Sequence, residues 1–307
     1  MKHVLVTGAS GLFGLNLALT AAQSGYHVTG WSGRHALVQT PFAAEQVDLT
    51  ELEGLPARIA ALAPDVIIHC AAMANLDVCE QHPLAAQRVN AEVPGELAEL
   101  AASRGIQMVH ISTDAVFDGV RGDYSETDTP HPLSVYAETK LAGEQAVLSA
   151  DPRALVARVN FFGWSLNGQR SLAEWFYNNL SNGIPVNGFT DVFFCPLLVN
   201  TLADTLMEMT DRQLSGLYHV FGSQAVSKAD FGRAIARQFG FDEELVKPIS
   251  WREHGLKAPR SAKLTMRIDK LVSALGHNMP SPAEEIACFQ QQFLVGYSRQ
   301  IASYQLD

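Results

Sequence analysis

The stretch that decides the fold is Val4-Leu5-Val6-Thr7-Gly8-Ala9-Ser10-Gly11-Leu12-Phe13-Gly14. Three apolar residues, typical of a buried strand, run into a glycine-rich turn, and a helical pattern follows from Leu12 to Gln23. Glycine permits the tight turn, the approach of backbone N–H groups to a pyrophosphate, and close packing of helix on strand. Since a helix N-terminus also carries partial positive charge, the stretch predicts a dinucleotide-binding turn formed by Gly8, Ser10, Gly11, Leu12, Phe13 and Gly14.

The spacing of these glycines is GxxGxxG, whereas the commonest dinucleotide fingerprint is GxGxxG. A strand-to-helix turn without any ligand is therefore an alternative interpretation. The position of the turn at the first strand–helix junction favours the ligand, because doubly wound sheets bind cofactors outside the carboxyl ends of their strands.

Short apolar runs alternate with helical patterns through the first half of the chain. After the glycine turn, strands are expected over residues 27–29, 65–70, 107–111 and 154–158, and helices over residues 52–62, 85–103 and 135–148. Strict alternation of this kind implies right-handed crossovers and a parallel sheet covered on both faces. The sequence therefore predicts an α/β protein with a Rossmann-type doubly wound parallel sheet.

The regular alternation breaks near Asn160, where segments rich in Asn, Gly and Pro take over. We expect a dinucleotide-binding Rossmann domain over residues 1–158, to which residues 190–212 return. A smaller, mixed C-terminal region for substrate binding is expected from residues 159–189 and 213–307.

Composition excludes several classes of partner. Of 307 residues 47% are hydrophobic and 18% are charged, enough for a full core, and the net charge of −10 argues against nucleic acid or an anionic membrane surface. No apolar run approaches the about 18 residues of a membrane span, and no signal-peptide pattern opens the chain. The ten histidines lack metal-ligand spacing, so no metal is predicted. Cysteines without framework spacing indicate reduced thiols and a cytoplasmic protein: Cys70, Cys79, Cys195 and Cys288.

The end of the second strand distinguishes the two nicotinamide cofactors. A carboxylate there would bind the ribose hydroxyls of NAD and repel a 2′-phosphate, but residues 30–35 contain none. Arg34 offers a charge-assisted phosphate contact and Ser32 a hydroxyl, so NADPH is preferred and NADH remains possible. A solvated loop arginine is the alternative. Asp48, followed by Leu49, is placed to reach the adenine amine, or else to cap the next segment.

Tyr136 and Lys140 lie four residues apart on an expected helix and hence on one face. The pKa of a tyrosine is about 10, and an adjacent ammonium would stabilise the phenolate; bringing that pKa to neutrality needs about 4 kcal/mol. The YxxxK spacing alone is common by chance. Upstream, Thr113 directly follows a strand end, where its hydroxyl could hold a substrate carbonyl oxygen beside Tyr136.

In order and spacing these motifs resemble the extended short-chain dehydrogenase/reductase family. Within it, residues 112–119 (STDAVFDG) and 135–144 (VYAETKLAGE) are similar to STDYVFDG and VYGxTKLAGE of the dTDP-4-dehydrorhamnose reductase branch, and residues 216–220 and 259–260 extend the similarity more weakly. The resemblance implies reduction of a keto group on a nucleotide-activated sugar, with Tyr136 as proton donor, Lys140 tuning it and holding the nicotinamide ribose, and Thr113 orienting the carbonyl. It also implies that the strand end at Cys70, Ala71 and Ala72 lines the cofactor; Cys70 is interpreted as a small packing residue.

Three residues differ from the sequence pattern of this branch, and the identity of the sugar substrate therefore stays open. Ala115 and Ala74 stand where the branch has tyrosine and threonine, and Thr265 where it has aspartate. Because Asp114 is followed by alanine and not by glutamate, the elimination chemistry of related 4,6-dehydratases is disfavoured. Asn160 is a candidate contact for substrate or cofactor, or a turn residue.

Arg260 is a candidate for binding a nucleotide diphosphate, or forms a surface ion pair.

Two other functions of the protein stay open. The chain is also similar to the regulatory subunit of methionine adenosyltransferase, across residues 69–72 and 77–78 among others, which would mean NADP binding without turnover. An epimerase would use the same tyrosine with a tightly held NAD. Analogy with relatives suggests a homodimer.

Overall fold

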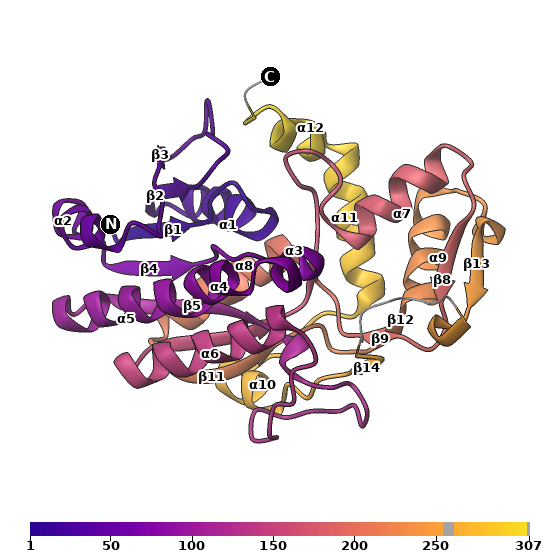
Figure 1. Cartoon of the computed structure of the whole chain (residues 1–307). Helices are drawn as coiled ribbons and strands as arrows, with labels where there is room; N and C mark the ends of the chain where they lie inside the picture. The colour runs from indigo at the N-terminus through magenta and orange to yellow at the C-terminus, as the bar shows by residue number, and fades with distance from the viewer. Residues whose placement is uncertain (254–260, 306–307) are drawn as a thin grey trace.

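The computed structural model describes residues 1–253 and 261–305. Its centre is a seven-stranded parallel sheet in the order β11-β6-β5-β4-β1-β2-β3 (Figure 1). The strands are β1 (His3–Thr7), β2 (His27–Ser32), β3 (Ala43–Gln46), β4 (Val66–His69), β5 (Gln107–Thr113), β6 (Leu155–Val159) and β11 (Gly216–Val220). The expected Rossmann-type doubly wound sheet is confirmed.

Helices cover both faces of this sheet because its strands are apolar on both sides. In β1, Val4 and Val6 face the core under α1 (Leu12–Gln23) and α8 (Val199–Asp211), whereas Leu5 faces the opposite core. The opposite face is covered by α2 (Leu55–Leu62), α5 (Val93–Arg104) and α6 (Val135–Ala150). Because all pairings in this sheet are parallel, the carboxyl ends of its seven strands lie at the same edge.

The helix expected over residues 85–103 is confirmed, as part of a continuous helical run from residue 83 to residue 104 that contains one π turn. The run comprises α4 (Pro83–Gln87), the π turn (Arg88–Glu92) and α5, with Pro83 and Pro94 in the first turns of α4 and α5, and the short helix α3 (Leu76–Gln81) precedes it. The π turn brings the Asn90 carbonyl against Gly143 of α6, where an added Cβ would lie 2.2 Å from that oxygen. Close approach of the two segments explains both the bulge and the glycine.

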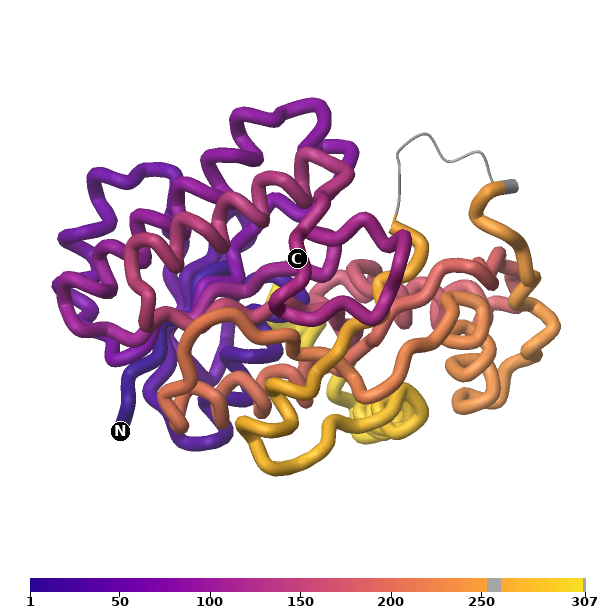
Figure 2. Tube along the Cα trace, turned by 90° about the horizontal axis from the view of Figure 1, so that it is seen from below, coloured from indigo at the N-terminus to yellow at the C-terminus, as the bar shows by residue number. Residues whose placement is uncertain are grey.

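A smaller region lies beyond one end of the sheet (Figures 1 and 2). Its core is aromatic: Trp164 stacks on Phe289 at 4.0 Å, and Phe162 meets Phe231 edge-on at 5.1 Å. Its helices are α7 (Leu172–Ser181), α9 (Lys228–Phe239), α11 (Pro282–Leu294) and α12 (Tyr297–Ala302), whereas α10 (Asp269–Leu275) packs against β11 of the large sheet (Figure 1). Its short strands are β7 (Phe161–Phe162), β8 (Val186–Phe189), β9 (Phe193–Phe194), β10 (Leu197–Leu198), β12 (Val226–Ser227), β13 (Val246–Ile249) and β14 (Lys263–Leu264).

The structure differs from the expected division at one strand and at α10, which packs on that strand. Residues from 213 onward were assigned to the smaller region, but β11 pairs with β6 in the large sheet, Gly216 opposite Leu155 through Val220 opposite Val159. The pairing joins segments about sixty residues apart, and such non-local partners leave no local signal. The α8 helix packs on α1 beneath the large sheet. Within residues 1–253 and 261–305, no helix is both long and apolar enough to cross a membrane.

Candidate functional site

The glycine turn joins the ends of two neighbouring strands. Gly8 has φ +69°, and an added Cβ would lie 2.7 Å from the Ala71 nitrogen, so the turn after β1 touches the segment after β4. Gly11 caps α1 without a side-chain acceptor from the described residues, and the first turn of that helix contains no acid. Its first backbone N–H groups therefore receive no side-chain cap from the described residues, and the partial positive charge of this helix end suits a pyrophosphate. Ser10 and Phe13 are buried and Leu12 is half-buried.

Gly14 provides the closest contact within this turn. A Cβ at Gly14 would lie 2.3 Å from the Gly8 carbonyl oxygen, which is backbone and cannot turn away. We expect Gly14→Ala to lower the free energy of unfolding by about 1–3 kcal/mol and to weaken dinucleotide binding at least about tenfold, a loss of about 1.4 kcal/mol. Chemical denaturation and fluorescence titration measure the two effects. Gly54→Ala is the matched control, because Gly54 has helical angles and open space; equal behaviour of the two variants would contradict the close-packing argument.

The carboxyl end of β2 carries the residues expected at the adenosine end. Ser32 is buried, and its hydroxyl donates to the Glu45 carbonyl at 3.4 Å. Arg34 is exposed, close enough to Asp48 to help lower the pKa of that carboxyl. The main causes of that lowering are the Thr50 hydroxyl and N–H, which donate to Asp48 Oδ1 at 2.7 and 2.9 Å. Asp48 thus closes a local turn beside Leu49, and the residue is exposed.

Thr113 and Tyr136 meet at the carboxyl end of β5. Ser134 caps α6, its hydroxyl accepting from the Ala137 N–H at 3.3 Å, and the first turn of the helix presents Tyr136. Burial raises the pKa of Tyr136 to about 12, and a hydrogen bond with the Thr113 side chain opposes the rise. At neutral pH the phenol therefore keeps its proton, which is the form a proton donor needs.

The hydrogen bonds of Lys140 run to β5, and its tuning of Tyr136 stays a prediction for the cofactor-bound protein. Lys140 is 2% exposed, and its ammonium donates to the Ile111 carbonyl at 2.7 Å and lies 3.3 Å from His110 Nε2. Burial lowers the pKa of Lys140 to about 8.

A buried row of polar side chains under Lys140 was missed in the sequence. The Thr7 hydroxyl lies 2.7 Å from His69 Nδ1, and the His69 ring stacks on that of His110 at 5.5 Å. Burial, with Lys140 nearby, lowers the pKa of His69 to about 3 and that of His110 well below its usual value. Both rings are therefore neutral beside the ammonium. The sequence carries no local signal for this pair, because the register that places His69 beside His110 arises only when β4 pairs with β5.

Asp114 and Asn160 lie beside Thr113. The Asn160 amide donates to Asp114 Oδ2 at 2.6 Å, and the Thr113 hydroxyl to Oδ1 at 3.2 Å. Burial raises the pKa of Asp114 to about 6. This supports the interpretation of Asp114 as a positioning group and brings Asn160 to the same strand ends. Arg260 lies outside the described residues, as does Pro259.

Asn90 connects the segment after β4 to α6. Its side chain accepts from the Met73 N–H at 2.8 Å and donates to the Met73 carbonyl at 3.0 Å and the Thr139 hydroxyl at 3.1 Å. Cys70, Ala71 and Ala72 are thereby held between the glycine turn and the face of α6 that carries Lys140. Burial raises the pKa of the Cys70 thiol, which disfavours a thiolate there.

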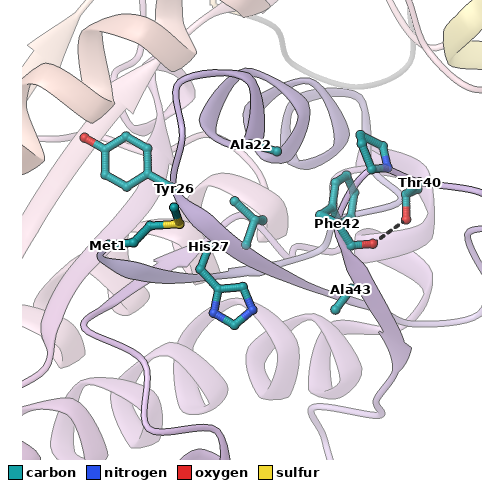
Figure 3. A pocket seen from close by; sticks show the side chains of 9 residues that line it. Met1, Ala22, Tyr26, His27, Thr40, Phe42 and Ala43 are labelled. Carbon is teal, nitrogen blue, oxygen red and sulfur yellow. Dashed lines mark hydrogen bonds between the residues drawn. The ribbon is translucent and has the colours of Figure 1, made fainter.

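A separate cavity of about 430 Å³ opens at the amino ends of β2 and β3 (Figure 3). Tyr26, His27 and Phe42 line it, and the Thr40 hydroxyl donates to the Phe42 carbonyl at 2.7 Å. It lies at the opposite edge of the sheet from the strand ends described above. No group of three or more potential metal ligands occurs in the described part of the chain.

Comparison with known proteins agrees with this geometry. Residues 1–294 match the family model described as RmlD substrate binding domain. The chain is 32% identical to the probable low-salt glycan biosynthesis reductase Agl14 of Haloferax volcanii, over 95% of this chain and 98% of that protein. It is also 32% identical to dTDP-4-dehydrorhamnose reductase of Mycobacterium tuberculosis (85% and 83% covered) and to methionine adenosyltransferase 2 subunit beta of Bos taurus (86% and 80%).

The fold agrees with a solved structure as well. The crystal structure of dTDP-4-dehydrorhamnose reductase from Bacillus anthracis in complex with NADP superposes with a TM-score of 0.84, covering 95% of this chain and 100% of that one at 24% identity. The match to the family model covers both the large sheet and most of the smaller region. The chain belongs to the RmlD substrate binding domain family, whose named relatives here include nucleotide-sugar reductases.

Proposed function

We propose that this protein is an NADPH-dependent reductase of a keto group on a nucleotide-activated sugar, resembling dTDP-4-dehydrorhamnose reductase. One observation carries the proposal: Thr113 and a protonated Tyr136 meet at the strand ends, beside the open N-terminus of α1. The relatives named as reductases, at 32% identity, support the same chemistry.

In this proposal each residue has a separate task. The backbone of the glycine turn binds the pyrophosphate, and Lys140 lies one helical turn from Tyr136 to hold the nicotinamide ribose. Bound NADPH supplies the hydride. The Thr113 hydroxyl orients the carbonyl of the sugar, and the Tyr136 phenol gives its proton to the carbonyl oxygen. Asp114 and Asn160 keep Thr113 in position.

The test is consumption of NADPH by the purified chain against a panel of nucleotide 4-keto sugars, with the reduced sugar identified by mass spectrometry. Turnover with at least one member of the panel is the expected result. Bound NADPH without turnover, together with co-purification of a partner enzyme, would favour the alternative function as a regulatory subunit, which the methionine adenosyltransferase relative motivates. Purified protein carrying stoichiometric NAD would point to an epimerase.

Arg34 is proposed to select NADPH through the 2′-phosphate. It is exposed at the end of β2, and residues 30–35 contain no carboxylate that would favour NADH. We expect Arg34→Ala to weaken NADPH binding about tenfold or more, the loss of one charge-assisted contact, and to leave NADH binding nearly unchanged. Fluorescence titration with each cofactor measures the ratio of the dissociation constants for NADPH and NADH. An equal loss for both cofactors would contradict the assignment.

We propose the cytoplasm as the compartment and a homodimer as the assembly. The four cysteines are free thiols, which suits a reducing environment. The helices α5 and α6 pack against each other on one face of the sheet, where relatives are expected by analogy to dimerise. Analytical ultracentrifugation tests the assembly; a monomer at micromolar concentration would contradict it.

A further inference from the structure

One loop of the smaller region reaches back to the glycine turn. It connects β7 to α7 and touches both α1 and the glycine turn before it. The Asn16 side chain donates to the Trp164 carbonyl at 3.0 Å, and the Arg170 guanidinium donates through Nη1 to the Ser10 carbonyl at 3.3 Å. Contacts between residues about 150 positions apart thus bring a cation to the edge of the turn.

A buried carboxylate accepts hydrogen bonds from the backbone of this loop. Glu174 is fully buried and accepts hydrogen bonds from the backbone N–H groups of Ser165, Arg170 and Ser171, at 2.6, 2.9 and 3.0 Å. Ser171 and Glu174 also form a capping box at the start of α7. The Arg170 backbone is therefore fixed, while its side chain is exposed.

The guanidinium keeps most of its donors available. Among the described residues its own hydrogen bond is the one to Ser10, and the nearby Glu174 carboxylate is occupied by backbone and hydroxyl groups. An arginine has five N–H donors in a planar fork that matches phosphate oxygens. Arg170 thus presents free donors beside the turn that is expected to bind phosphates.

The turn itself lacks a cation. Residues 3–33 contain neither lysine nor arginine, and the chain as a whole carries a net charge of −10. The helix N-terminus contributes an equivalent of about half a positive charge, whereas a pyrophosphate carries two negative charges. A cation from elsewhere in the fold would complement the remaining charge.

We infer that Arg170 binds the pyrophosphate of the dinucleotide, closing over it from the smaller region. The inference rests on the proposed function, since it names a further residue of the same cofactor site. It differs from the role of Arg34, which stands at the end of β2 beside Asp48 and faces the adenosine end. A pyrophosphate contact serves NADPH and NADH alike, whereas a 2′-phosphate contact serves NADPH alone.

The test is a binding titration of both cofactors against wild type, Arg170→Ala and Arg34→Ala. We expect Arg170→Ala to weaken NADPH and NADH by the same factor, about tenfold to a hundredfold, with Arg170→Lys intermediate. Arg104→Ala is the matched control, because Arg104 is exposed and bonds only within the end of α5 among the described residues; its affinities should equal those of wild type.

Two results would overturn the inference while leaving the proposed function intact. One is unchanged affinity of Arg170→Ala for both cofactors; the other is a loss confined to NADPH, which would assign Arg170 to the 2′-phosphate. If the wild-type protein binds neither cofactor, the proposed function fails as well. Thermal unfolding of each variant, expected within about 2–4 °C of wild type, shows that the loop remains folded.

Discussion

Replacing Tyr136 by phenylalanine is expected to lower the turnover of keto-sugar reduction by about 10²- to 10⁴-fold. The substitution removes the phenol proton and leaves the aromatic ring in place. Because burial holds the pKa of Tyr136 at about 12, the wild-type phenol is protonated throughout the neutral range, and turnover should not fall through deprotonation of this group until strongly alkaline pH. Steady-state kinetics with the sugar found active in the panel provide the measurement.

Measurement of NADPH affinity distinguishes the loss of the proton donor from a general disruption of the cofactor site. The affinity of Tyr136→Phe for NADPH should equal that of wild type, since the pyrophosphate and adenosine contacts are unchanged. Tyr26→Phe is the matched control: its hydroxyl bonds to Asp211 at the opposite edge of the sheet, so turnover should be normal. Wild-type turnover in Tyr136→Phe would remove the tyrosine from the mechanism.

The second large effect is on stability and concerns a buried ion pair under the site. Arg158 of β6 donates from Nε and Nη2 to the two carboxylate oxygens of Glu144 at 2.9 and 2.7 Å, and both side chains are at most 4% exposed. The Ser112 hydroxyl donates to the same carboxylate, and the guanidinium lies 4.9 Å from the Phe117 ring centre. Glu144→Gln would leave the arginine charge buried without a counter-ion.

We expect Glu144→Gln to lower the free energy of unfolding by about 3–5 kcal/mol, measured by urea denaturation. Glu92→Gln is the control, since its pair with Arg88 lies on the surface of one helix and contributes about 0.5 kcal/mol or less. A decrease in the free energy of unfolding no larger than that of Glu92→Gln would show that the buried pair is dispensable for stability. The double variant Glu144→Leu with Arg158→Met should recover part of the loss, because it removes both charges together.

Local features of this protein were readable from its sequence because their causes are local. The glycine turn follows from the need for positive φ at Gly8 and from the lack of room for a Cβ at Gly14. Tyr136 and Lys140 share a face because helical periodicity alone places residues four apart together. Alternation of apolar runs with helical patterns was enough to predict the parallel sheet.

Other features depend on pairing between distant segments. No local pattern joins β11 to β6, and none brings Arg170 to Ser10 or the π turn to Gly143. The upward shift in the pKa of Tyr136 also depends on distant segments, because it follows from burial of the phenol against other elements.

The amino-acid sequence by itself determined the class of fold, the dinucleotide turn and the identity of the residues that meet at the strand ends. The tertiary structure alone decided where Lys140 directs its ammonium, which neutral histidines lie beneath it, and which arginine reaches the turn from the smaller region. The physical reason is that periodicity and turn geometry act within a few residues. Burial, charge and register are set by neighbours that the chain brings together only on folding.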